Sequence, residues 1–166
     1  MPASSSTGFR IASFLVLPLV WAVTVSGAQT ECAECDRVVA RVLRLLPKRP
    51  PRVVVLDSAV VTPSLRQKLN GTEGFVTTGD PTVYLNKQGS TFAQALRGPG
   101  FWDCVLAVII LHEMAHLDGG DESEAQRQEE LLWQRFVLEG RIDRARGLNY
   151  LALLRKRADK TRADQP

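Results

Sequence analysis

Two histidines and a glutamate stand close together near the middle of the chain, in the segment His112-Glu113-Met114-Ala115-His116. Residues four apart on a helix lie on one face, one turn apart, so His112 and His116 can direct two imidazole nitrogens at one cation. Glu113 is rotated from His112 by about 100° around the helix axis, where it can reach a water bound to that cation. The pattern predicts a zinc site whose bound water loses a proton to a carboxylate.

Composition restricts the remaining ligand of such a site. A catalytic zinc takes three protein ligands and a water, and the chain contains 2 histidines, both in this segment. The third ligand must therefore be a carboxylate or, less favourably, a cysteine. The pair Gly119-Gly120 can end the first helix, and Asp121 can cap a second helix that runs back antiparallel to it. In that hairpin Glu122 faces the second histidine, and Glu129, two turns on, faces the level of the first.

The segment resembles the active-site helix of zincin metallopeptidases, which carry the H-E-x-x-H pattern. An uninterrupted apolar run, Val105 to Leu111, leads into it, as expected for a buried helix in which low dielectric strengthens the field of the metal. Asp118 departs from the extended zincin pattern, which tends to have an apolar residue there. The specific part of the resemblance is limited to residues 109–125.

Within the zincins, the missing third histidine excludes the metzincin extension. The run Glu122-Ser123-Glu124-Ala125 resembles the Glu-x-x-Ala context in which gluzincins carry their third ligand. The resemblance implies that Glu113 is the general base, and Glu124 and Glu129 stay open as alternatives to Glu122. It implies one Zn²⁺ per chain on three ligands, His112, His116 and Glu122.

Peptide hydrolysis also needs a hydrogen-bond donor for the oxyanion that forms on the carbonyl. In gluzincins this donor is often a tyrosine or a histidine, and no histidine is left. The resemblance therefore predicts Tyr150 as a catalytic residue, with Tyr84 or an arginine as alternatives. For each tyrosine the favoured alternative is a core ring whose hydroxyl lies at the surface.

Hydrophobic periodicity and turn residues predict an α+β fold. The resemblance implies that this fold is zincin-like, with a small twisted sheet before the active-site helix and an antiparallel helix after it. The resemblance implies an edge strand that pairs with the substrate backbone, and Thr82 to Asn86 is the segment assigned there; an ordinary hairpin strand is the alternative. The expected strands are 52–57, 74–78 and 82–86. The expected helices are 35–46, 62–69, 90–96, a long apolar helix after Gly100, one from 122 to Gly140, and 141–159.

The first 28 residues have the organisation of a secretory signal peptide. Arg10 precedes an apolar run, Ile11 to Val25, and Ser26-Gly27-Ala28 supplies the small residues of a cleavage site. This predicts an exported chain with one domain over residues 29–166. If the segment stays uncleaved, it can anchor the chain, and membrane association is expected only through residues 11–28.

Three cysteines are present, Cys32, Cys35 and Cys104. In an exported protein a structural disulfide is the favoured use. A thioredoxin-type redox pair would need a βαβ unit around it, and a zinc knuckle would need a second cysteine pair. Three outcomes stay open: a bridge from the first two residues to Cys104, a local Cys32–Cys35 bridge, or three free thiols.

The charge distribution argues against nucleic acid as a partner. The formal net charge is +3, and basic residues gather at the C-terminal end, as in Arg155-Lys156-Arg157, without aromatic interleaving. The expected partner is a peptide or protein substrate, and the oligomeric state is left open. Two other hypotheses are a zinc amidase acting on a cell-wall or other non-protein amide and a non-catalytic partner-binding module. Glu113 argues against the module, because it serves catalysis and not coordination.

Overall fold

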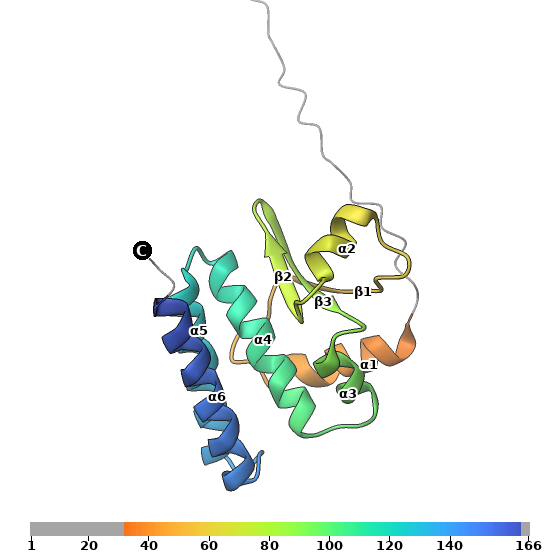
Figure 1. Cartoon of the computed structure of the whole chain (residues 1–166). Coiled ribbons are helices and arrows are strands. Elements are labelled where there is room, and N and C mark those ends of the chain that lie inside the picture. Colours follow the sequence, from red (N-terminus) through yellow and green to blue (C-terminus); the bar gives the residue numbers. More distant parts are fainter. Residues whose placement is uncertain (1–31, 164–166) are drawn as a thin grey trace, which may run out of the picture.

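The computed structural model describes residues 32–163 (Figure 1), so the predicted signal peptide at residues 1–28 lies outside the described residues. The described chain combines helices with a three-stranded sheet, which confirms the α+β class. The helices are α1 (Ala33–Leu43), α2 (Pro63–Leu69), α3 (Ser90–Leu96), α4 (Phe101–Leu117), α5 (Glu122–Leu138) and α6 (Arg144–Ala163). The strands are β1 (Arg52–Leu56), β2 (Gly74–Thr77) and β3 (Asp80–Asn86). Among residues 32–163, none of the helices has both the length and the apolar character that a membrane span requires.

The sheet has the order β1-β3-β2, so β3 lies in its centre. Strand β3 pairs parallel with β1, where Val53 lies opposite Val83, and antiparallel with β2, where Phe75 lies opposite Tyr84. The prediction that Thr82 to Asn86 is an edge strand is therefore wrong. Both sides of this strand are hydrogen-bonded to neighbours, because β1 joins it through a crossover that contains α2. A substrate backbone cannot add to β3.

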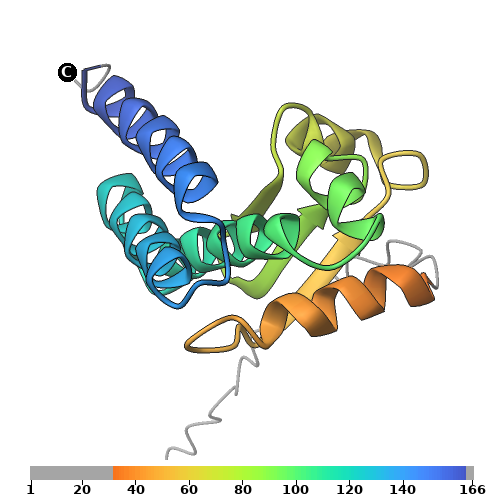
Figure 2. The same ribbon diagram turned by 90° about the horizontal axis from the view of Figure 1, so that it is seen from below.

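Helix α4 is the centre of the packing. Leu106, Ala107, Val108 and Ile110 have no exposed surface, so this helix is apolar on all sides, as expected for one covered by other elements all round. The sheet and α3 lie on one side of it and α5 and α6 on the other (Figure 1). Viewed from below, α1 runs beside β1 (Figure 2), and it also packs on α4.

A partly buried ion pair fixes α1 to the first turn of α4. The guanidinium of Arg41 donates from Nε to Oδ2 of Asp103 at 3.0 Å and from Nη2 to Oδ1 at 3.1 Å. The same Nη2 donates to the carbonyl of Ala95 at 2.9 Å, which includes α3 in the contact. Asp103, the third residue of α4, also accepts a hydrogen bond from the backbone N–H of Gly100, the N-cap residue, and so stabilises the first turn of this helix. The start of α4 is thereby held from two directions.

Of the three arrangements left open for the cysteines, the structure has the local bridge. Cys32 and Cys35 form a disulfide across the first turn of α1. Cys104 is a free, buried thiol at the start of α4, and burial raises its pKa to about 11. The last helix begins at Arg144 and not at residue 141, because Asp143 accepts a hydrogen bond from the backbone N–H of Arg146 and caps it there.

Candidate metal centre

The turn between α4 and α5 follows the expected glycine and capping pattern. Gly119 has φ 87°, and the backbone N–H of Gly120 donates to the carbonyl of Ala115 at 2.8 Å. A Cβ at Gly120 would lie 2.9 Å from that same oxygen. Asp121 then caps α5 by accepting from the backbone N–H of Glu124 at 2.9 Å. This tight turn brings the first residue of α5 back toward the last turns of α4.

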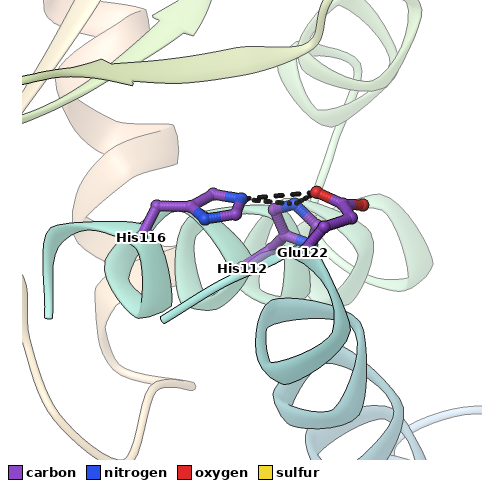
Figure 3. A group of neighbouring side chains, drawn as sticks. All are labelled: His112, His116 and Glu122. Carbon is purple, nitrogen blue, oxygen red and sulfur yellow. Dashed lines mark hydrogen bonds and ion pairs between the residues drawn. The ribbon is translucent and has the colours of Figure 1, made fainter. Parts of the chain in front are cut away.

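Three side-chain atoms converge at this point. Nε2 of His112 and Nε2 of His116 are 3.3 Å apart, and Oε2 of Glu122 lies 3.5 Å from the first and 3.4 Å from the second (Figure 3). These residues form a group whose ligand atoms could hold one metal ion. Figure 3 shows the two rings coming from α4 and the carboxylate from the start of α5. The structure thus brings together the three residues predicted as zinc ligands.

The spacing of these atoms fits a small tetrahedral ion. Zinc binds imidazole nitrogen at about 2.0–2.1 Å and carboxylate oxygen at about 2.0–2.2 Å. Tetrahedral angles then separate neighbouring ligand atoms by about 3.3–3.5 Å. The three observed separations, 3.3, 3.4 and 3.5 Å, lie in this range.

The other ring nitrogens face acceptors of the protein. Nδ1 of His116 lies 3.0 Å from the carbonyl oxygen of Gly120. Nδ1 of His112 lies 3.3 Å from Oε2 of Glu129, although the alignment is not that of a regular hydrogen bond. An acceptor at Nδ1 favours the tautomer with the proton on that atom, which leaves Nε2 with a bare lone pair. Two such lone pairs and a carboxylate oxygen then point at one another, an arrangement that a cation stabilises.

The two alternative carboxylates lie differently. Glu129 is buried and lies at Nδ1 of His112, whereas Glu122 lies at Nε2 of the same ring. Glu124 pairs with Arg127 at 2.8 Å on the exposed face of α5, and hydrogen bonds from Arg127 and then Gln128 lower its pKa to about 2. Glu122 is therefore the carboxylate that completes the group, while Glu129 is positioned to orient one of its rings. Sequence reasoning placed Glu129 at the level of His112, from its seven-residue spacing to Glu122, but as an alternative ligand and not as an orienting residue.

Glu113 is half-buried next to the two histidines. Burial raises the pKa of its carboxyl group, and the nearby charges of His112 and His116 act in the opposite direction. The pKa of His112 is also raised: burial acts to lower it, but the neighbouring carboxylates of Glu129, Glu122 and Glu113 together outweigh that effect. A carboxyl group with increased proton affinity at the edge of a metal centre can take up a proton from a bound water.

The structure does not bring either tyrosine to this group. The ring of Tyr150 packs on Trp133 and Phe101, with centroid separations of 4.2 and 6.0 Å. Phe101 opens α4, and eleven residues at about 1.5 Å each separate it from His112 by about 16 Å. Tyr84 faces the α2 side of the sheet, stacks on Phe75 and donates to Asp80. The predicted donor Tyr150 therefore belongs to an aromatic cluster at the opposite end of α4.

A groove of about 410 Å³ opens beside the last turn of α4. Leu117, one helical turn after Glu113, and Met114 form its apolar floor, and the β2–β3 turn at Gly79 forms one wall. Lys48 also lines the groove and pairs with Asp118 at 3.1 Å.

Comparison of the chain with protein-family models, with curated proteins and with solved structures finds no match.

Proposed function

We propose that this protein is a zinc-dependent metallopeptidase of gluzincin type. The observation that carries the proposal is the convergence of Nε2 of His112, Nε2 of His116 and Oε2 of Glu122 at tetrahedral spacing. Glu113 follows His112 on the same helix and is not one of the three converging residues. A structural zinc site takes a fourth protein ligand, whereas a catalytic site keeps that position for water. Three ligands and an adjacent carboxylate favour catalysis.

The proposed roles follow from the contacts of each residue. Zn²⁺, when bound, lowers the pKa of its water and polarises the substrate carbonyl. Glu113 takes the proton of that water and passes it to the leaving amine, so that water and a peptide bond become a carboxylic acid and an amine. Glu129 and the carbonyl of Gly120 hold the two rings in the orientation that keeps both Nε2 atoms directed at the metal.

For the substrate we propose the open side of β2. Within residues 32–163, β2 is hydrogen-bonded to β3 alone, and it packs on α4, where a Cβ at Gly74 would lie 3.3 Å from the side chain of Ile109. An extended peptide that adds to this edge gains main-chain hydrogen bonds with little dependence on sequence. It would then run close to the helix that carries Glu113.

The test is hydrolysis of a peptide mixture by the zinc-loaded chain, read by mass spectrometry, with Glu113→Gln as the matched variant. We expect about one zinc in both chains, because Glu113 is not a ligand. Cleavage by the variant should be slower by about 10²–10⁴-fold, the usual contribution of a general acid–base group. Zinc in both chains with no cleavage by either contradicts a peptidase, and a non-protein amide substrate in the same assay tests the amidase hypothesis. A native chain without zinc contradicts the whole proposal.

A further inference from the structure

We propose that the Cys32–Cys35 disulfide is a thiol–disulfide exchange site that accepts two electrons from a dithiol, independently of the metal centre. The two cysteines lie at the start of α1, an 11-residue helix. The residues assigned to zinc lie at the α4–α5 turn. Nothing in the proposed hydrolysis uses this disulfide.

The two sulfur atoms differ in how they can be approached. Cys32 is the N-cap residue of α1 and is partly exposed, and its Sγ accepts from the backbone N–H of Cys35 at 3.2 Å. Cys35 is 2% exposed and packs in the core beside Val38. An incoming thiolate can therefore reach Sγ of Cys32 and not Sγ of Cys35. The helix N-terminus stabilises negative charge on Cys32 when this residue is released from the mixed disulfide.

A purely structural role accounts poorly for this bond. It joins residues three apart within one helix and connects no two elements of the fold. In the loop-entropy model, so short a loop contributes about 2 kcal/mol, near the lower end for disulfides. The helix is held independently, by its buried Val38 and Val42 and by the ion pair of Arg41 with Asp103. The bond can open while α1 stays in position.

A groove of about 380 Å³ lies directly beside the disulfide. It is lined by both cysteines, by apolar side chains of α1 and β1 such as Val39 and Val53, and by the charged residues Asp36, Asp57 and Lys87. Strand β1 is paired on one side only within the described residues, so the groove runs along an open strand edge. These features suit a cysteine thiol carried by an extended, apolar peptide segment. A small thiol such as glutathione offers the same reacting group without the segment.

The exchange balances in two steps. A thiolate of the dithiol attacks Sγ of Cys32, a new S–S bond forms, the Cys32–Cys35 bond breaks, and its electron pair leaves on Sγ of Cys35, which takes a proton. The second thiolate of the dithiol attacks the first sulfur of the dithiol, which is now bonded to Cys32. This forms the new disulfide and releases Cys32, which is then protonated. The dithiol becomes a disulfide, and Cys32 and Cys35 become thiols. Two electrons and two protons pass between them.

The experiment compares the full-length variants Cys35→Ser, which leaves the exposed cysteine, and Cys32→Ser, which leaves the buried one. Each is mixed with oxidised glutathione or with a disulfide-linked peptide whose cysteine stands between valines, and mixed disulfides are followed by mass spectrometry. We expect Cys35→Ser to react at least about tenfold faster than Cys32→Ser. A faster reaction with the peptide assigns the groove to a protein thiol, and equal reaction with glutathione assigns the site to small thiols.

Cys104 provides an internal control, since its buried thiol should stay unmodified while the chain is folded. In the native chain, dithiothreitol should then expose Cys32 to alkylation and leave the buried thiols of Cys35 and Cys104 unlabelled. Equal rates for the two variants overturn the proposal. So does a native disulfide that opens only when Cys104 is labelled as well, because it would then be a structural bond released by unfolding. Zinc loading plays no part in either readout, so the result is independent of the proposed peptidase activity.

Discussion

Each histidine of the candidate metal centre directs one ring nitrogen at Glu122 and the other at an acceptor of the protein. The outer contacts come from different sources, a backbone carbonyl for His116 and the buried carboxylate of Glu129 for His112. Substitution of a residue that contacts the outer nitrogen of a metal-binding histidine commonly lowers metal affinity by about 10–100-fold. Ligand and outer-contact roles can therefore be separated by the size of the effect.

Glu122→Gln should lower zinc affinity by more than about 100-fold, because it removes a charged ligand and not an outer contact. The matched control is Glu124→Gln, two residues further along the same helix, whose carboxylate is engaged by Arg127. Competition with a chromophoric chelator measures both affinities. Equal losses in the two variants would contradict the assignment of Glu122.

Glu129→Gln should lower zinc affinity by about 10–100-fold without abolishing binding. The amide keeps the size of the side chain and loses the charge that raises the pKa of His112. Protons should then compete less with zinc, so the loss of affinity should be smaller at acidic pH than at neutral pH. Glu130→Gln is the control, since Glu130 pairs with Arg155 on the exposed side of α5. An unchanged affinity and pH profile would show that Glu129 does not act on His112.

At the scale of elements, the site depends on how α4 is held at both ends. Its last turn continues into the Gly119-Gly120 turn and α5, which brings the third carboxylate to the histidines. Its first turn is held by the pair of Arg41 and Asp103. The side chain of Asp103 is 6% exposed, so loss of its cation leaves a carboxylate that water cannot fully solvate.

Arg41→Ala should destabilise the fold by about 2–3 kcal/mol, somewhat less than a fully buried pair, because the arginine is 26% exposed. Arg37→Ala, one turn earlier on α1, removes an exposed pair with Glu34 and should change stability by about 0.5 kcal/mol or less. Urea unfolding followed by circular dichroism measures both. Similar values for the two variants would contradict the anchoring role of Arg41.

At the scale of the whole molecule, a metal at this site would link α4, the central helix, to α5 and through it to α6. A ligand that binds only the folded chain stabilises it, by about 2.7 kcal/mol at a concentration of 100 times its dissociation constant. For a chain of this size, that raises the unfolding temperature by on the order of 10 °C. A chelator should reverse the increase.

The stability of the fold should depend on pH with opposite sign in the metal-free and the zinc-bound chain. Without metal, the folded-state pKa of His112 is raised. The contribution of His112 to the stability of the metal-free fold is therefore complete below the unfolded-state pKa of about 6.5. It is lost as the pH rises through the folded-state pKa. With zinc, binding needs neutral imidazoles and strengthens with pH. Thermal unfolding with zinc and with chelator should therefore differ strongly at pH 8 and converge toward pH 5.5; a difference that does not change with pH would contradict the site.

Local sequence patterns determined most of the secondary structure of this protein and the positions of the three candidate metal ligands. The strand and helix positions follow from apolar periodicity and turn residues, and most agree with the structure within a few residues. The group of His112, His116 and Glu122 was also predictable, because a four-residue spacing, a two-glycine turn and a capping aspartate act within some ten residues. Such features depend on backbone geometry that neighbouring residues set by themselves.

Tertiary structure decided what depends on contacts between distant segments. The central position of β3 results from a crossover connection, and the local bridge of Cys32 left Cys104 free although the sequence allowed other pairings. Helix periodicity put Glu129 at the level of His112, but only packing could choose which ring nitrogen it meets. Tyr150 has the right chemistry for an oxyanion donor, yet α6 pairs it with the far end of α4. Side-chain chemistry can be seen in the sequence, whereas which groups share a site depends on how the helices pack.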